Sequence, residues 1–91
     1  MQLSFIKNIQ FTKLIKADGR LREFNFRRYN SGSAPAIFSV NVVDNRDNRI
    51  IFEMQKEDNT WKITKQPLPQ WILENENNFH DCIEEELKAS S

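Results

Sequence analysis

The dipeptide Asp18-Gly19, set between two alternating segments, constrains the fold of this chain more than any other feature. A two-residue hairpin turn needs a positive φ at both central positions, and Asp-Gly is among the sequences that tolerate this best. The flanking residues 11–16 and 21–29 are therefore predicted to form a β-hairpin. Its register pairs Ala17 with Arg20 and gathers four apolar side chains on one face, namely Phe11, Ile15, Phe24 and Phe26.

Three further segments, residues 36–43, 49–56 and 60–65, also alternate between apolar and polar side chains. Polar turns separate them, and the third turn of the chain, the tight turn Asp58-Asn59, pairs Met54 with Ile63. Residues 1–10 alternate as well and are expected to extend the first strand, although the spacing of their apolar residues also suits a helical turn.

A proline-led helix is predicted to follow the strands. Pro67 and Pro69 end the sheet, because proline donates no ladder hydrogen bond, and Pro69 suits the first position of a helix. The spacing of the apolar residues after it predicts an amphipathic helix over about residues 69–88, with 75–78 as a weak segment where it can kink. The expected fold is one α+β domain over residues 1–91, an antiparallel meander of about five strands packed by one C-terminal helix.

Composition narrows the cellular setting. The chain has 91 residues and one cysteine, Cys82, so it contains no internal disulfide framework. We expect a reducing, cytoplasmic location. No stretch resembles a secretory signal or approaches a membrane span of about 18 apolar residues, so no membrane association is expected.

Charge divides the chain into a basic beginning and an acidic end. Residues 1–30 carry seven Lys and Arg against two acidic residues, and residues 66–91 carry one lysine against six. Such a division indicates two surfaces with different partners, or one surface that binds the other. The cations cluster on the first hairpin and the acids on the helix.

Several side chains that the predicted core does not use are candidates for contact with a partner. Lys16, Arg20 and Arg27 are the cations left for an outside partner, and Tyr29 lies on the face opposite the core with Arg27. Trp71 falls about 100° around the helix from its apolar stripe. Five apolar residues also fall on the sheet face away from the core, which is typical of an interface: Leu14, Leu21, Ile37, Val43 and Ile51.

Catalytic and metal signals are weak. His80 stands between Glu76 and Glu84 on one helix stripe, but three ligands without a fourth favour an ordinary exposed helix surface over a metal site. Cys82 is expected to be half-buried and unreactive. The chain has no nucleophile elbow or phosphate-binding glycine loop, so no cofactor is expected, and an enzyme using carboxylates alone is the weakest alternative.

The order of elements resembles the single-strand-binding folds of the positive-cofactor transcriptional coactivators and the Pur-type repeats. The likeness covers residues 11–88 and rests locally on Pro69-Gln70-Trp71 and Arg27-Arg28-Tyr29. It implies dimerisation and binding of single strands on a basic sheet surface. The chain departs from these folds by an extra strand and by a loop, residues 31–35, without lysine or arginine.

Two functions from different classes follow. The first is a protein-interaction or self-assembly module, with a protein partner or a second copy of the chain, in which the basic hairpin meets an acidic helix. Its expected contact residues are Lys16, Arg20, Arg27, Tyr29 and Trp71. The alternative is binding of single-stranded nucleic acid on the basic sheet surface, with cations on phosphates and Tyr29 stacking on a base.

Overall fold

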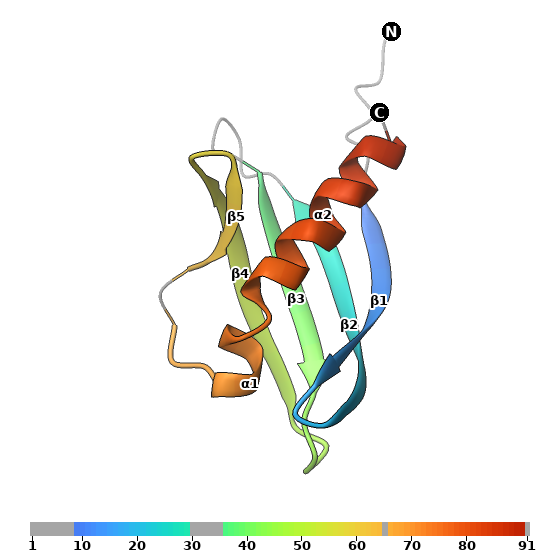
Figure 1. Ribbon diagram of the computed structural model, residues 1–91, viewed down its shortest axis with the longest axis vertical. Helices are drawn as coiled ribbons and strands as arrows, with labels where there is room; N and C mark the ends of the chain where they lie inside the picture. Colours follow the sequence, from blue (N-terminus) through green and yellow to red (C-terminus); the bar gives the residue numbers. More distant parts are fainter. Residues whose placement is uncertain (1–8, 30–35, 65, 91) are drawn as a thin grey trace, which may run out of the picture.

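Five antiparallel strands lie side by side in the order in which they occur in the chain (Figure 1). The computed structural model describes residues 9–29, 36–64 and 66–90. The strands are β1 (Gln10–Ala17), β2 (Arg20–Tyr29), β3 (Ile37–Val43), β4 (Arg49–Glu57) and β5 (Thr60–Ile63). The predicted α+β meander is confirmed, and the sheet curls as a half-barrel around a C-terminal helix. The predicted extension of the first strand over residues 1–8 lies outside the described residues.

Tight turns set the register of the sheet. Asp18 and Gly19 have φ values of 54° and 83°, and Asp58 and Asn59 have values of 50° and 68°. These are the positive angles that a two-residue turn of the primed type requires, and glycine adopts them without strain. The predicted pairings of Ala17 with Arg20 and of Met54 with Ile63 are both confirmed.

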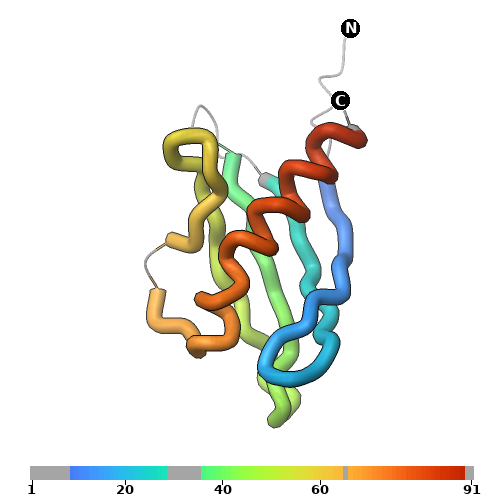
Figure 2. The backbone as a smooth tube through the Cα atoms, viewed as in Figure 1, coloured from blue at the N-terminus to red at the C-terminus, as the bar shows by residue number. Residues whose placement is uncertain are grey.

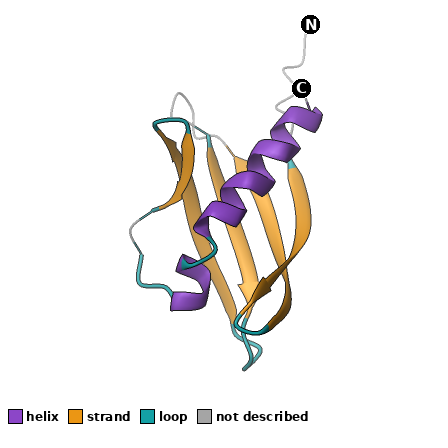
Figure 3. Cartoon of the chain, viewed as in Figure 1, coloured by secondary structure: helices purple, strands orange, loops and turns teal. Residues whose placement is uncertain are grey.

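The C-terminal helix is divided in two. A single turn, α1 (Gln70–Leu73), precedes the longer α2 (Glu76–Ser90), and both lie on the same face of the sheet (Figure 3). The break falls at the start of the segment where a kink was predicted. Asn75 is buried there, and its Nδ2 donates 2.8 Å to the carbonyl oxygen of Trp71. Its own carbonyl oxygen accepts from the backbone N–H of Phe79, so one residue ends α1 and begins the bonding of α2.

Helix α2 crosses the sheet obliquely, and its C-terminal end lies beside β1 (Figure 2). Its central side chain, Phe79, is fully buried, with ring centroids 4.9 Å from Phe24, 6.1 Å from Phe26 and 5.5 Å from Phe52. The buried face of the sheet and the helix stripe form one core. All of the core therefore lies on the helix side, and the other side, hereafter the outer face, is covered by no element that the structure describes.

Candidate interaction surface

The basic residues predicted as contacts lie on the hairpin β1–β2. Lys16 and Arg27 are exposed on the outer face, and Arg20 is exposed beside the turn. Tyr29 pairs through its backbone with Ile37, but its side chain lies outside the described residues. The structure thus brings three of the predicted cations onto one hairpin.

Large apolar side chains lie among these cations. Leu14 is 65% exposed, Leu21 63% and Ile51 61%. Leu14 pairs with Glu23 and Leu21 pairs with Lys16, so the two leucines are diagonal neighbours across β1 and β2. Exposure of these residues agrees with the surface expected from the sequence, whereas Ile37 and Val43 are half-buried.

A row of polar side chains crosses the middle of the outer face. Thr12 Oγ1 donates 2.7 Å to Asn25 Oδ1, and Asn25 Nδ2 donates 3.1 Å to Asn41 Oδ1. Arg49 Nη1 donates to the same Asn41 oxygen over 2.5 Å. The row spans β1 to β4 and orders their side chains. A hollow of about 390 Å³, lined in part by Thr12, Asn25 and Arg27, lies beside it.

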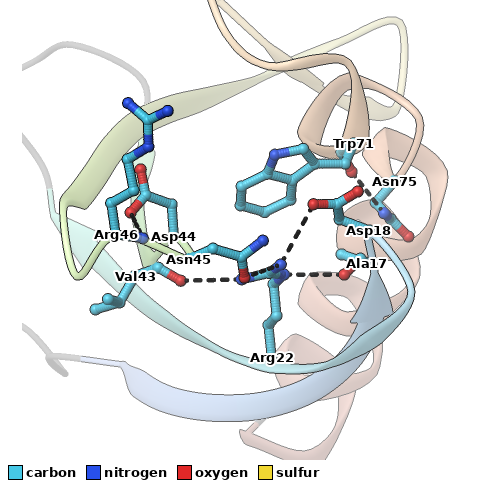
Figure 4. Close-up of polar contacts among 9 residues, drawn as sticks. All are labelled: Ala17, Asp18, Arg22, Val43, Asp44, Asn45, Arg46, Trp71 and Asn75. Carbon is cyan, nitrogen blue, oxygen red and sulfur yellow. Dashed lines mark hydrogen bonds and ion pairs between the residues drawn. The ribbon is translucent and has the colours of Figure 1, made fainter.

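Arg22, by contrast, is only 4% exposed, and its side chain is hydrogen-bonded within the protein. Its guanidinium donates 2.9 Å to the carbonyl oxygen of Ala17, 3.4 Å to that of Val43 and 2.8 Å to Asn45 Oδ1 (Figure 4). It also forms an ion pair with Asp18 at 3.4 Å. The guanidinium therefore joins the β1–β2 turn to the β3–β4 turn, and its donors are already used by the protein.

Trp71 covers this arginine. The guanidinium carbon lies 4.6 Å from the centroid of the indole ring, a cation–π contact that leaves Trp71 half-buried (Figure 4). Trp71 thus lies on the helix side of the sheet, away from Lys16 and Arg27 on the outer face. The structure therefore separates it from Lys16 and Arg27, two of the cations predicted to share its partner.

The turn beside this cluster is held by Asp44. Its Oδ1 accepts from the backbone N–H of Arg46 at 2.8 Å and from that of Asn48 at 2.9 Å. The backbone N–H of Asn48 is the main cause that holds the pKa of Asp44 below its ordinary value. This carboxylate stabilises a turn and is not a candidate base.

The stripe of Glu76, His80 and Glu84 is not a solvated helix surface, so that expectation was wrong. Glu76 Oε2 accepts from the backbone N–H of Ile63 at 2.8 Å, and His80 Nδ1 accepts from that of Trp61 at 3.0 Å. Glu84 Oε2 accepts 2.8 Å from the Trp61 indole. All three side chains of the stripe thus bind the edge strand β5. Among residues 9–29, 36–64 and 66–90, no group of His, Cys, Asp and Glu can hold a metal ion.

The pKa values of two side chains on α2, Glu84 and Cys82, differ from their ordinary values. Burial works against the charge of Glu84, but hydrogen bonds from the Trp61 indole and Lys56 outweigh it and lower the pKa of this carboxyl. Burial raises the pKa of the Cys82 thiol, which is half-buried as expected. A raised thiol pKa disfavours the reactive thiolate at neutral pH.

Comparisons with known proteins identify no relative. No family model, no curated protein and no solved structure matches the chain. The likeness to the coactivator and Pur-type folds therefore stays one of element order, and the sheet has five strands where those folds have four. Within the described part of the chain, no helix has the length and apolar character needed to cross a membrane.

Proposed function

We propose that this chain is a non-catalytic protein-interaction module that binds an acidic partner through the outer face of hairpin β1–β2. The observation that carries the proposal is the exposure of Leu14 and Leu21 side by side, at 65% and 63%, next to Lys16. Exposed apolar side chains ringed by charge are typical of protein interfaces. The cations would orient the partner and speed association, while the leucines would supply buried area.

The acidic partner can itself be a second copy of the chain. Asp81 and Glu85 are exposed and stand four residues apart on α2, so they share one outward stripe. In this self-assembly form, the stripe of one copy meets Lys16 and Arg27 of another. Sedimentation at low salt tests it, because a monomer at every concentration excludes a homodimer and leaves a different protein as the partner.

Photocrosslinking in cells tests the proposal and captures the partner in the same step. A benzophenone amino acid replaces Leu14 in one variant and the exposed Gln70 in α1 in a matched control. The proposal expects a discrete protein adduct in the chain's native cells from position 14 and none from position 70. The adduct should disappear when Lys16 and Arg27 are both changed to Glu. Equal labelling from both positions, or none from position 14, would contradict the proposal.

Single-stranded nucleic acid is the second candidate, favoured by the exposed Lys16, Arg20 and Arg27. It ranks lower because every aromatic side chain that the structure describes belongs to the core or packs against it, on the helix side. A base on the outer face would therefore find no described ring on which to stack. Fluorescence anisotropy of a labelled oligonucleotide tests it, and an unchanged anisotropy at low salt would exclude it.

A further inference from the structure

The hydrogen bonding of β1 shows which of its backbone groups face away from the sheet. The carbonyl oxygen of Ile9 accepts 2.9 Å from the N–H of Arg28, and Ala17 pairs with Arg20 at the two-residue turn. In an antiparallel pair, alternate residues bond to the neighbour. The odd-numbered residues of β1 thus bond to β2. The N–H and C=O groups of the even-numbered residues point outward, and these are Gln10, Thr12, Leu14 and Lys16.

The opposite edge of the sheet, formed by β5, also has backbone N–H groups that face away from its neighbouring strand, and there the helix accepts them. The N–H of Thr64 bonds to the carbonyl oxygen of Glu53, so the outward N–H groups of β5 are those of Trp61 and Ile63. Both are accepted by α2, through His80 and Glu76. No described side chain does this for β1. Among the described residues, the helix thus closes the β5 edge of the sheet, and nothing closes the β1 edge along its exposed residues.

Charge decides what can pair with the open edge. β1 carries Lys13 and Lys16 and no acidic residue, and Arg27 lies opposite Gln10 on β2. Lysines on an edge strand disfavour pairing with an identical strand, because the second copy would add its own cations at close range. The same lysines favour a strand with carboxylates. The edge is thus protected against self-association and remains open to an acidic segment.

We propose that the open edge of β1 binds an extended acidic peptide segment of a partner protein, which adds to the sheet as a further strand. This inference rests on the proposed interaction function and names its partner. Main-chain hydrogen bonds to the even-numbered residues would supply affinity, and side chains would supply specificity. On the outer face, an apolar residue of the segment would lie against Leu14, and Asp or Glu would lie against Lys16.

The probe is an acetylated peptide of alternating glutamate and valine, with a lysine–valine peptide as the control. Amide hydrogen exchange of the full chain, labelled with ¹⁵N, provides the readout. The acidic peptide should slow exchange at Thr12, Leu14 and Lys16 by about tenfold or more, while Lys13 and Ile15 change little. This alternation distinguishes strand addition from any side-chain contact on the outer face. The control peptide should produce no protection.

Two variants at position 14 distinguish the contribution of the backbone N–H to binding from that of the side chain. Leu14→Pro removes an outward N–H that bonds to no described strand, and proline is tolerated on edge strands, whereas Leu14→Ser keeps that N–H. We expect Leu14→Pro to weaken binding by about tenfold or more and Leu14→Ser to weaken it less. If Leu14→Pro does not fold, Lys16→Glu supplies the test, because it should weaken the glutamate–valine peptide and improve the lysine–valine peptide.

Several results would overturn the inference: equal binding of both peptides, protection of consecutive rather than alternate amides, or protection of β1 that rises with protein concentration when no peptide is present. The last would assign the edge to a second copy. Failure here is distinguishable from failure of the proposed function. Crosslinking from position 14 that persists while the acidic peptide does not bind would reject strand addition alone, and loss of both would reject both.

Discussion

The backbone N–H of Trp61 donates a 3.0 Å hydrogen bond to Nδ1 of His80. An imidazole nitrogen accepts a hydrogen bond only when it carries no proton, so this contact requires the ring proton of His80 to be on Nε2. Together with Glu76 on Ile63, this contact closes the β5 edge of the sheet. The helix thus has two functions, since it fills the core with one stripe and satisfies an edge strand with the next.

Replacement of His80 should destabilise the protein through the edge it closes. His80→Ala leaves the N–H of Trp61 without its acceptor, which should lower the free energy of unfolding by about 1 kcal/mol. His80→Asn places an amide oxygen near the position of Nδ1 and should lower it less. Urea denaturation of both variants measures the difference. Equal loss in the two variants would show that packing, and not the hydrogen bond, is what His80 contributes.

Glu84 should make stability depend on pH. Its pKa is lowered in the folded protein, because hydrogen bonds from Trp61 and Lys56 outweigh the effect of burial. Its contribution is therefore full above the pKa of the unfolded chain and is lost as pH falls through the folded value. Between about pH 5 and about pH 3, the wild type should lose more stability than Glu84→Gln. Parallel losses of stability for the two proteins over these pH values would contradict the lowered pKa of Glu84.

Phe79 should be the costliest single truncation in the helix. Its ring contacts Phe24 and Phe52 and has no exposed surface. Phe79→Ala should reduce the free energy of unfolding by about 3–5 kcal/mol, since it leaves a cavity among rings that cannot collapse to fill it. Leu73→Ala, at a position 41% exposed, is the control. It should change stability by about 0.5 kcal/mol or less.

Replacement of Arg22 should destabilise the protein more than replacement of Arg20, because Arg22 is buried and hydrogen-bonded whereas Arg20 is exposed. Arg22→Ala removes the guanidinium that Ala17, Val43 and Asn45 share, and we expect a loss of about 2–3 kcal/mol in the free energy of unfolding. Arg20→Ala changes an exposed residue and should cost about 0.5 kcal/mol or less. Thermal and chemical denaturation provide the values. Equal effects would mean that the two turns are not joined by Arg22.

Most of the fold follows from local signals in the sequence. Asp18-Gly19 and Asp58-Asn59 fix their turns through backbone angles alone, so the register of each hairpin follows from the turn residues and needs no tertiary contact. The apolar alternation then assigns the faces, and Phe24, Phe26 and Phe79 are buried as the pattern requires.

The contacts between helix and sheet edge could not be predicted in the same way. Glu76, His80 and Glu84 form a polar stripe that is indistinguishable in sequence from a solvated one. Their role depends on how far α2 rotates about its axis and on which N–H groups of β5 face outward. The sequence did contain one usable signal. The Asp58-Asn59 turn already determines that the backbone N–H groups of Trp61 and Ile63 point away from β4.

Arg22 illustrates a different limit, because the alternation of the hairpin places it on the core face opposite Ile15 but does not say what its guanidinium binds. It belongs to the basic hairpin in sequence, but its side chain lies on the core side beside Trp71 and two turns. A charge count cannot distinguish it from Lys16 or Arg27, which are exposed on the outer face. The surface available to a partner is therefore smaller than the charge of the hairpin indicates, and it includes Leu14 and the backbone edge of β1.

In the part of the chain that the structure describes, the helix closes one sheet edge and leaves the other open, and amide hydrogen exchange of the protein alone tests this difference most directly. After correction for intrinsic rates, the amides of Trp61 and Ile63 should exchange about tenfold or more slower than those of Thr12 and Leu14. Strong protection at Thr12 and Leu14 in the monomer, or rapid exchange at Trp61 and Ile63, would contradict the account.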